Sequence, residues 1–168
     1  VRPNRLVRRG VLLASVIMCG LFVLRGPRLL SVTPSPGNGF ESPRPTAWVK
    51  SKLMGGEEGW VSPTDRAEVV IRTASHRRPK SLVEAKEVVL NELDAFGIEP
   101  EVVREEARVV DGLSAIYLEI RFRETGRGGR NREMWAMLIP RGRLLHRVKV
   151  FVDEGWRWRY KGLADRLF

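Results

Sequence analysis

Four segments with β-strand character follow one another in the C-terminal half of the chain, and short turns separate them. Asp111-Gly112, between the first two segments, is a favoured two-residue hairpin turn, and Arg141-Gly142 separates the last two. Because such short connections join antiparallel neighbours, this region predicts an antiparallel meander. The predicted strands are residues 101–110, 113–123, 132–140 and 143–152.

A helix is predicted before the meander. Ser81 and Glu84 have the spacing of a capping box, in which each side chain satisfies a free amide of the first turn. Gly97 is a typical left-handed residue after the end of a helix. The apolar residues between these signals recur at helical spacing. They are Leu82, Ala85, Val89, Leu93 and Phe96.

A second helix is predicted at the C-terminus, with Asp153 as its N-terminal cap. Trp158 lies about 200° round this helix from Trp156, so we expect Trp158 to face outward. Residues 48–53 and 67–74 add two strands before the meander. The pattern therefore predicts an α+β fold of two layers, an antiparallel sheet with two helices on one face. The buried stripe of the last helix is Trp156, Tyr160, Leu163 and Leu167.

The N-terminus has the pattern of a transmembrane anchor. Residues 10–24 carry no charge, and a basic stretch before such an apolar core is typical of a secretory signal or a signal anchor. No small-residue cleavage pattern follows, which favours an uncleaved, single-pass anchor in the cell membrane. Four Arg side chains precede the apolar run and two follow it, so we expect a cytoplasmic N-terminus and an extracytoplasmic domain. A lipid on Cys19 is an alternative mode of anchoring.

These signals divide the chain into three parts. Residues 1–30 are the basic region and anchor, residues 31–46 a Pro-rich linker expected to be an extended spacer, and residues 47–168 a single α+β domain. The net charge is +10, but residues 1–30 hold six Arg and no acid. The remainder, with 24 basic and 20 acidic residues, is only mildly basic, which argues against a nucleic-acid partner.

The sequence indicates no catalytic residue, no metal site and no cofactor. With one Cys and two His, it lacks the usual ligands of a zinc site. His76 lies in a basic loop, and His146 lies alone within a predicted strand. Glu105 and Glu106 are adjacent on a strand and should point to opposite faces, so they cannot share a site. A hydrolase whose site the pattern does not reveal is an alternative.

Two surface features are candidate binding sites. Trp158, flanked by Arg157 and Arg159, suits contact with a membrane interface or a partner, or else covers a neighbouring loop. The loop between the second and third meander strands is rich in Arg, which suits anion binding but is also typical of a solvated hairpin tip. Its candidate anion-binding residues are Arg123, Arg127, Arg130 and Arg132.

Several short motifs accompany the predicted elements, namely Gly39-Phe40, Pro45, Trp48, Ser62-Pro63-Thr64-Asp65, the helix at Ser81, Val110-Asp111-Gly112-Leu113-Ser114-Ala115 and Leu167-Phe168. These motifs and the order of elements resemble the PsbP/DcrB-like family, whose members have a Mog-type α/β/α sandwich. The resemblance spans residues 39–168. It implies an anchored extracytoplasmic binding or assembly module without chemistry of its own, with a protein or envelope partner. The alternative is a cytoplasmic-side binder of anionic lipid or nucleic acid that uses the Arg-rich loop.

Overall fold

The computed structural model describes residues 29–34, 41–45, 48–52, 58–78, 80–125 and 129–168. The anchor expected at residues 10–24 lies outside these ranges, as does Arg127 of the Arg-rich loop. Within the described ranges, no helix has the length and hydropathy needed to cross a bilayer.

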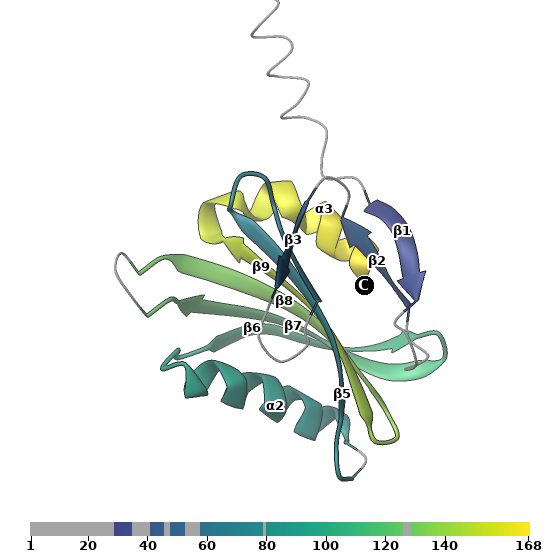
Figure 1. The fold of residues 1–168 in the computed structure, drawn as a ribbon. Coiled ribbons are helices and arrows are strands. Elements are labelled where there is room, and N and C mark those ends of the chain that lie inside the picture. The colour runs from purple at the N-terminus through teal and green to yellow at the C-terminus, as the bar shows by residue number, and fades with distance from the viewer. Residues whose placement is uncertain (1–28, 35–40, 46–47, 53–57, 79, 126–128) are drawn as a thin grey trace, which may run out of the picture.

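Seven strands form one antiparallel sheet in the order β3-β4-β5-β9-β8-β7-β6 (Figure 1). The predicted meander is confirmed as β6 to β9, and β5 pairs with β9 along its whole length. The first long strand of the domain thus lies beside its last, in the middle of the sheet. The bounds are β3 Val49–Lys52, β4 Glu58–Val61, β5 Ala67–Ser75, β6 Glu101–Val110, β7 Leu113–Arg123, β8 Asn131–Arg141 and β9 Leu144–Asp153.

In the described part of the chain, two α-helices accompany the sheet, α2 (Leu82–Ala95) and α3 (Arg157–Leu167), and a 3-10 turn, η1 (Glu154–Trp156), leads into α3. The predicted capping box is present: the Glu84 amide donates to Ser81 Oγ at 3.2 Å, and the Ser81 amide donates to Glu84 Oε2 at 2.9 Å. Gly97, with φ at 69°, turns the chain after α2 as expected.

The two helices lie on opposite faces of the sheet, so the prediction of one doubly covered face is wrong (Figure 1). Ile116 and Leu118 of β7 lie in the core beneath α2, whereas Tyr117 lies in the core beneath α3. The central strands β7, β8 and β9 each contain an unbroken run of buried residues, which requires cover on both faces. The domain is an α/β/α sandwich of three layers.

The Pro-rich segment at residues 31–46, expected to be an extended spacer, contributes instead to two paired strands. Strands β1 (Leu29–Pro34) and β2 (Glu41–Pro45) pair as a separate two-stranded antiparallel sheet, and β2 contacts α3 (Figure 1). Proline lacks an amide hydrogen, but a two-stranded sheet has outer edges where that donor is not needed. Part of the stretch at residues 31–46 therefore lies against the folded body.

Two single residues differ from the predictions, and one confirms them. Phe96 follows α2 as its C-terminal cap and is 74% exposed, because the chain leaves the helix before its side chain reaches the core. The Asp153 carboxylate makes no capping bond and instead accepts from Arg66 at 2.9 Å. Trp158 faces outward as predicted and is 69% exposed.

Candidate functional site

Two carboxylates are buried between the sheet and α3. Glu119 on β7 and Glu133 on β8 are each 3% exposed. The strand register pairs Glu119 with Trp135 and Glu133 with Arg121, so both carboxylates are on the side of the sheet that α3 covers. A carboxylate removed from water is stable only if charged partners and hydrogen bonds replace the water.

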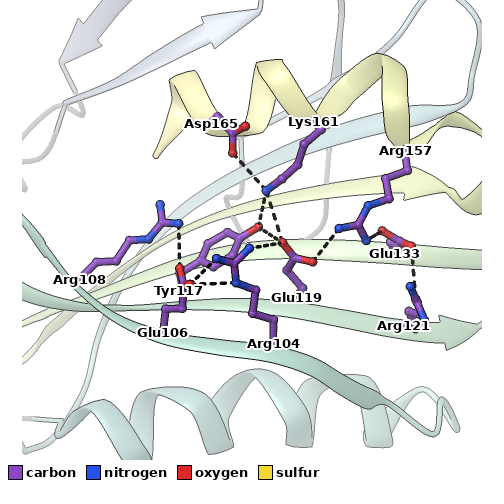
Figure 2. Close-up of polar contacts among 10 residues, drawn as sticks. All are labelled: Arg104, Glu106, Arg108, Tyr117, Glu119, Arg121, Glu133, Arg157, Lys161 and Asp165. Atoms are coloured by element: carbon purple, nitrogen blue, oxygen red, sulfur yellow. Dashed lines mark hydrogen bonds and ion pairs between the residues drawn. The ribbon is translucent and has the colours of Figure 1, made fainter.

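Arg157, the first residue of α3, bridges both carboxylates (Figure 2). Its Nη2 donates to Glu119 Oε2 at 2.9 Å, and its Nη1 donates to Glu133 Oε2 at 2.6 Å. Arg121 adds a longer contact to Glu133, at 3.3 Å from Nε to Oε1. One guanidinium therefore neutralises charge on two adjacent strands and fixes the start of α3 above them.

Lys161 makes a second connection one turn further along α3. Its Nζ donates to Tyr117 Oη at 2.9 Å and to Glu119 Oε1 at 3.3 Å, and it lies 3.1 Å from the Asp165 carboxylate (Figure 2). The Tyr117 hydroxyl in turn donates to Glu119 Oε1 at 2.8 Å. We call the five residues Tyr117, Glu119, Glu133, Arg157 and Lys161 the α3 clamp.

Three groups of the clamp, Glu119, Tyr117 and Lys161, keep fixed protonation states at neutral pH. Burial alone would raise the pKa of Glu119, but hydrogen bonds from Tyr117 and Arg157 and the nearby positive charges outweigh burial and lower it. Burial raises the pKa of Tyr117 to about 12. Burial would lower the pKa of Lys161, but its bonds to Tyr117 and Asp165 outweigh that effect and raise it. Each of these shifts moves the pKa away from neutrality.

An exposed charged row on β6 continues the clamp beyond the cover of α3. Arg104 and Arg108 both pair with Glu106, the latter at 3.1 Å (Figure 2). Arg104 Nη1 also lies 3.7 Å from Glu119 Oε1, and the Arg108 guanidinium lies 4.4 Å from the centre of the Tyr117 ring. The edge strand thus presents alternating charges next to the buried site. Glu105 contacts Lys86 of α2, so it points to the opposite face from Glu106, as predicted.

The residues predicted around Trp158 have different surroundings. Trp158 lies on the outer side of α3, and the Arg159 guanidinium lies 5.8 Å from the centre of the Trp156 ring. Arg157, predicted as a flanking contact residue, is bonded to the clamp carboxylates instead. Of the predicted trio, Trp158 is exposed, whereas Arg159 is half-buried beside the Trp156 ring.

Two arginines predicted at the Arg-rich loop, Arg130 and Arg132, pair with acids of the same domain. Arg132 Nη1 donates to Glu124 Oε1 at 2.6 Å, and its Nε lies 3.7 Å from Asp153. Arg130 lies 3.5 Å from the same Asp153 carboxylate, and Arg123 is exposed. The structure therefore brings Arg130 and Arg132 together around a carboxylate.

The buried acids of the clamp were missed at the sequence level. Glu119 stands between Leu118 and Ile120 in an apolar stretch of its strand, and Glu133 directly precedes the apolar run that begins at Met134. An acid at that kind of position is the available signal for a buried ion pair. The identity of its partner, Arg157, is not encoded locally, because the contact joins residues far apart in the chain.

His146 is a packed residue of β9, which agrees with the structural interpretation of a lone strand histidine. It is buried, and its Nδ1 lies 2.7 Å from Thr73 Oγ1 on β5. Burial lowers the pKa of His146 to about 4 from the ordinary value of 6.5. The side chain is therefore neutral in the folded domain at physiological pH.

Replacing Arg157 with Met should destabilise the domain by about 3–5 kcal/mol, because Glu133 and Glu119 lose the guanidinium that compensates their buried charge. Equilibrium urea denaturation measures the change in the free energy of unfolding. Arg159→Met, a matched change on the same helix, should cost less than about 1 kcal/mol. Equal costs for the two variants would show that the clamp does not hold α3.

The buried His146 predicts a pH dependence of stability. In the unfolded chain His146 binds a proton below about pH 6.5, whereas in the folded domain its pKa is about 4 and it stays neutral down to that pH. The free energy of unfolding should therefore fall by about 1.4 kcal/mol per pH unit within that window as pH decreases. Urea denaturation at pH 7 and pH 5 tests this, since His146→Gln should remove most of the slope. His76→Gln should remove less of it, because burial also lowers the pKa of His76 but this side chain is only half-buried. An unchanged slope in His146→Gln would assign it to other groups.

The fold of this domain is similar to those of solved proteins. No family model and no curated protein sequence matches the chain. Among solved structures, PsbP (CyanoP) of Synechocystis sp. PCC 6803 is similar with a TM-score of 0.62 and 18% identity, over 84% of this chain and 89% of that one. The Saccharomyces cerevisiae Ran-binding protein Mog1p is similar with a TM-score of 0.58 and 9% identity, over 82% of this chain and 84% of that one.

These likenesses concern the fold. Both neighbours support a PsbP/Mog-type α+β fold for this domain, so the resemblance drawn from the sequence motifs is confirmed at that level. The same resemblance implied the α/β/α layering, which the strand pattern alone did not predict.

Proposed function

We propose that this protein is a non-catalytic binding or assembly module, anchored in the cell membrane by residues 10–24, with its domain on the extracytoplasmic side. The observation that carries the proposal is the presentation of Trp158. This large aromatic side chain is 69% exposed on α3, a helix tied to the sheet through Arg157 and Lys161.

A rigidly held, exposed tryptophan is well suited to binding a partner. Tryptophan and arginine are enriched among the residues that dominate binding energy at protein interfaces, and both occur here as Trp158 and Arg159. Because the clamp orders α3 before any partner arrives, association costs less conformational entropy than it would on a mobile segment. The surface is therefore pre-organised for contact with a protein or envelope component.

The electrostatics of the clamp support a role without chemistry. A general acid or base works best with a pKa close to the working pH. The surroundings move the pKa of Glu119 down and that of Lys161 up, and they place Tyr117 at about 12. Burial lowers the pKa of His146 to about 4, so this side chain is neutral at physiological pH. These groups are arranged to hold structure, and proton transfer at neutral pH is disfavoured.

The structural neighbours are consistent with a protein partner. Mog1p is named as a Ran-binding protein, so this fold serves as a protein-binding module in at least that case. PsbP (CyanoP) shares the fold at higher identity. The proposal for this chain extends that kind of role, and the partner is a protein or envelope component exposed on the outer side of the membrane.

The proposed location rests on the N-terminal sequence. Four Arg side chains before residues 10–24 and two after them favour retention of the N-terminus in the cytoplasm. The Arg-rich loop would favour the opposite orientation if it bound phosphates, but Arg130 and Arg132 already lie beside Asp153 and Glu124. Those pairs weaken the case for a phosphate-binding loop on the cytoplasmic side.

A photo-crosslinking amino acid in place of Trp158 in the full-length chain should give a discrete adduct in intact bacterial spheroplasts. External protease should then digest the domain while the N-terminal fragment stays in the membrane. Position 83 is the matched control, since Val83 is exposed on α2 at the opposite face of the sheet. Equal crosslinking at positions 158 and 83 would contradict a partner-binding surface on α3. Protection of the domain from external protease until the spheroplasts are lysed would contradict the extracytoplasmic location.

A further inference from the structure

Strand β6 is an open edge of the seven-stranded sheet. It pairs with β7 on one side, and no strand of the described ranges pairs with its other side (Figure 1). All ten of its residues are exposed or half-buried, and none of them is Pro or Lys. The opposite edge, β3, has only four residues. A long edge strand exposes a row of backbone N–H and C=O groups that can bind a further strand.

The regular part of β6 runs from Arg104 to Val110. The register with β7 shifts between Val102 and Arg104, and beyond that irregularity the residues face β7 one to one. The middle residue of the regular part is Ala107, which is exposed. If two copies of this segment pair antiparallel with full overlap, Ala107 therefore faces the same residue of the second copy. This overlap allows about six to eight backbone hydrogen bonds.

The charges of β6 match a second copy of the strand in this register. Arg104, Glu106 and Arg108 follow one another on the face of the sheet where α3 lies, and Glu106 contacts both arginines of its own copy. With Ala107 at the centre, Glu106 stands directly opposite Arg108 of the second copy, and the reverse pair forms as well. Opposite charges directly across an antiparallel pair stabilise it. The alternating row is therefore complementary to itself.

Neighbouring registers lack this match. If the symmetry axis passed through Glu106, that residue would face itself, and Arg104 would face Arg108. An axis through Arg108 would place two arginines opposite each other, and an axis through Glu105 would do the same with two glutamates. Like charges directly opposite are destabilising. The small, uncharged Ala107 is thus the favoured centre of the pair.

The other face of β6 adds an apolar contact. Val109 is 75% exposed, although it lies in a strand. In the register centred on Ala107 it faces Glu105 of the second copy, whose carboxylate is held by Lys86 of α2. The aliphatic parts of these two long side chains can cover Val109, and removal of its apolar area from water favours association.

We propose that two copies of this chain associate through β6, antiparallel about Ala107, so that their sheets continue as one. Such an interface is the same patch on both copies, as in most symmetric dimers. The two-fold axis is perpendicular to the sheet and keeps α3 of both copies on the same face. The dimer therefore leaves Trp158 uncovered, and its formation requires neither the membrane anchor nor the partner proposed above.

A disulfide across the axis tests the register. Ala107→Cys is introduced into the full-length chain together with Cys19→Ser, and the protein is purified in detergent micelles and oxidised. Directly opposite residues have Cβ atoms about 4.5–5.5 Å apart, close to the separation that a disulfide needs. Val109→Cys is the matched control on the same face, because its two copies would lie about 14 Å apart. The dimer band on a non-reducing gel should form at least about tenfold faster for Ala107→Cys.

Charge reversal tests the partner. Glu106→Arg or Arg108→Glu, each combined with Ala107→Cys, places like charges opposite each other, so crosslinking of either variant alone should be lost. In a mixture of the two, carrying different tags, every reversed charge faces its opposite. Crosslinking between the two tags should therefore be restored. Damage to the fold of either variant would give no such restoration.

Each alternative has its own outcome. Equal crosslinking rates for Ala107→Cys and Val109→Cys would show random collision and overturn the proposal. Failure of the mixed variants to crosslink would overturn the charge pairing between copies. Absence of any disulfide dimer would show that the charges of β6 keep a solitary edge in solution.

Discussion

The burial of Glu119 and Glu133 is the constraint on which the arrangement of this domain depends. Two buried carboxylates on neighbouring strands repel each other and have lost their hydration. A cation between them compensates both effects. Arg157 supplies that cation from the first turn of α3, and Lys161 adds a second one turn later. The position of the C-terminal helix, and with it the outward direction of Trp158, follows from this ion pairing together with the apolar contacts of Tyr160 and Leu163.

On the face of the sheet that α2 covers, the charges of the helix–sheet ion pairs are reversed. There the helix supplies the carboxylate, Glu92 of α2, and the sheet supplies the cations Arg147 and Lys149. Buried ion pairs add little net stability compared with apolar contacts, but a mismatched one is costly. If α2 packed on the wrong face, Glu92 would lie beside the clamp carboxylates. The two polarities therefore disfavour exchange of the helices.

The sequence predicted local features well and missed those that depend on distant contacts. The meander, the capping box at Ser81 and the outward direction of Trp158 follow from turns, caps and helical phase, which are encoded within a few residues. The layering depends on distant contacts: Ile116 and Leu118 alternate along β7 as one apolar face, but Tyr117 and Glu119 between them are buried on the other face by α3.

The candidate sites show the same limit. The exposure of Trp158 could be predicted from its place on a helix, but the pairing of Arg157 with two buried acids joins residues 24 and 38 positions apart in sequence. Phe96 was expected in the core because it continues a stripe, and the end of α2 just before it leaves its ring exposed. Helix ends and partners of buried charges are decided by the assembled fold.

Native-state hydrogen exchange of the α3 amides measures how firmly the clamp holds this helix to the sheet. If the clamp makes α3 part of the cooperative core, these amides should exchange only through global unfolding, with the same opening free energy as the central strand β8. Exchange of α3 at a much lower opening free energy than β8 would show that the helix detaches by itself, and the account of a pre-organised surface around Trp158 would be contradicted.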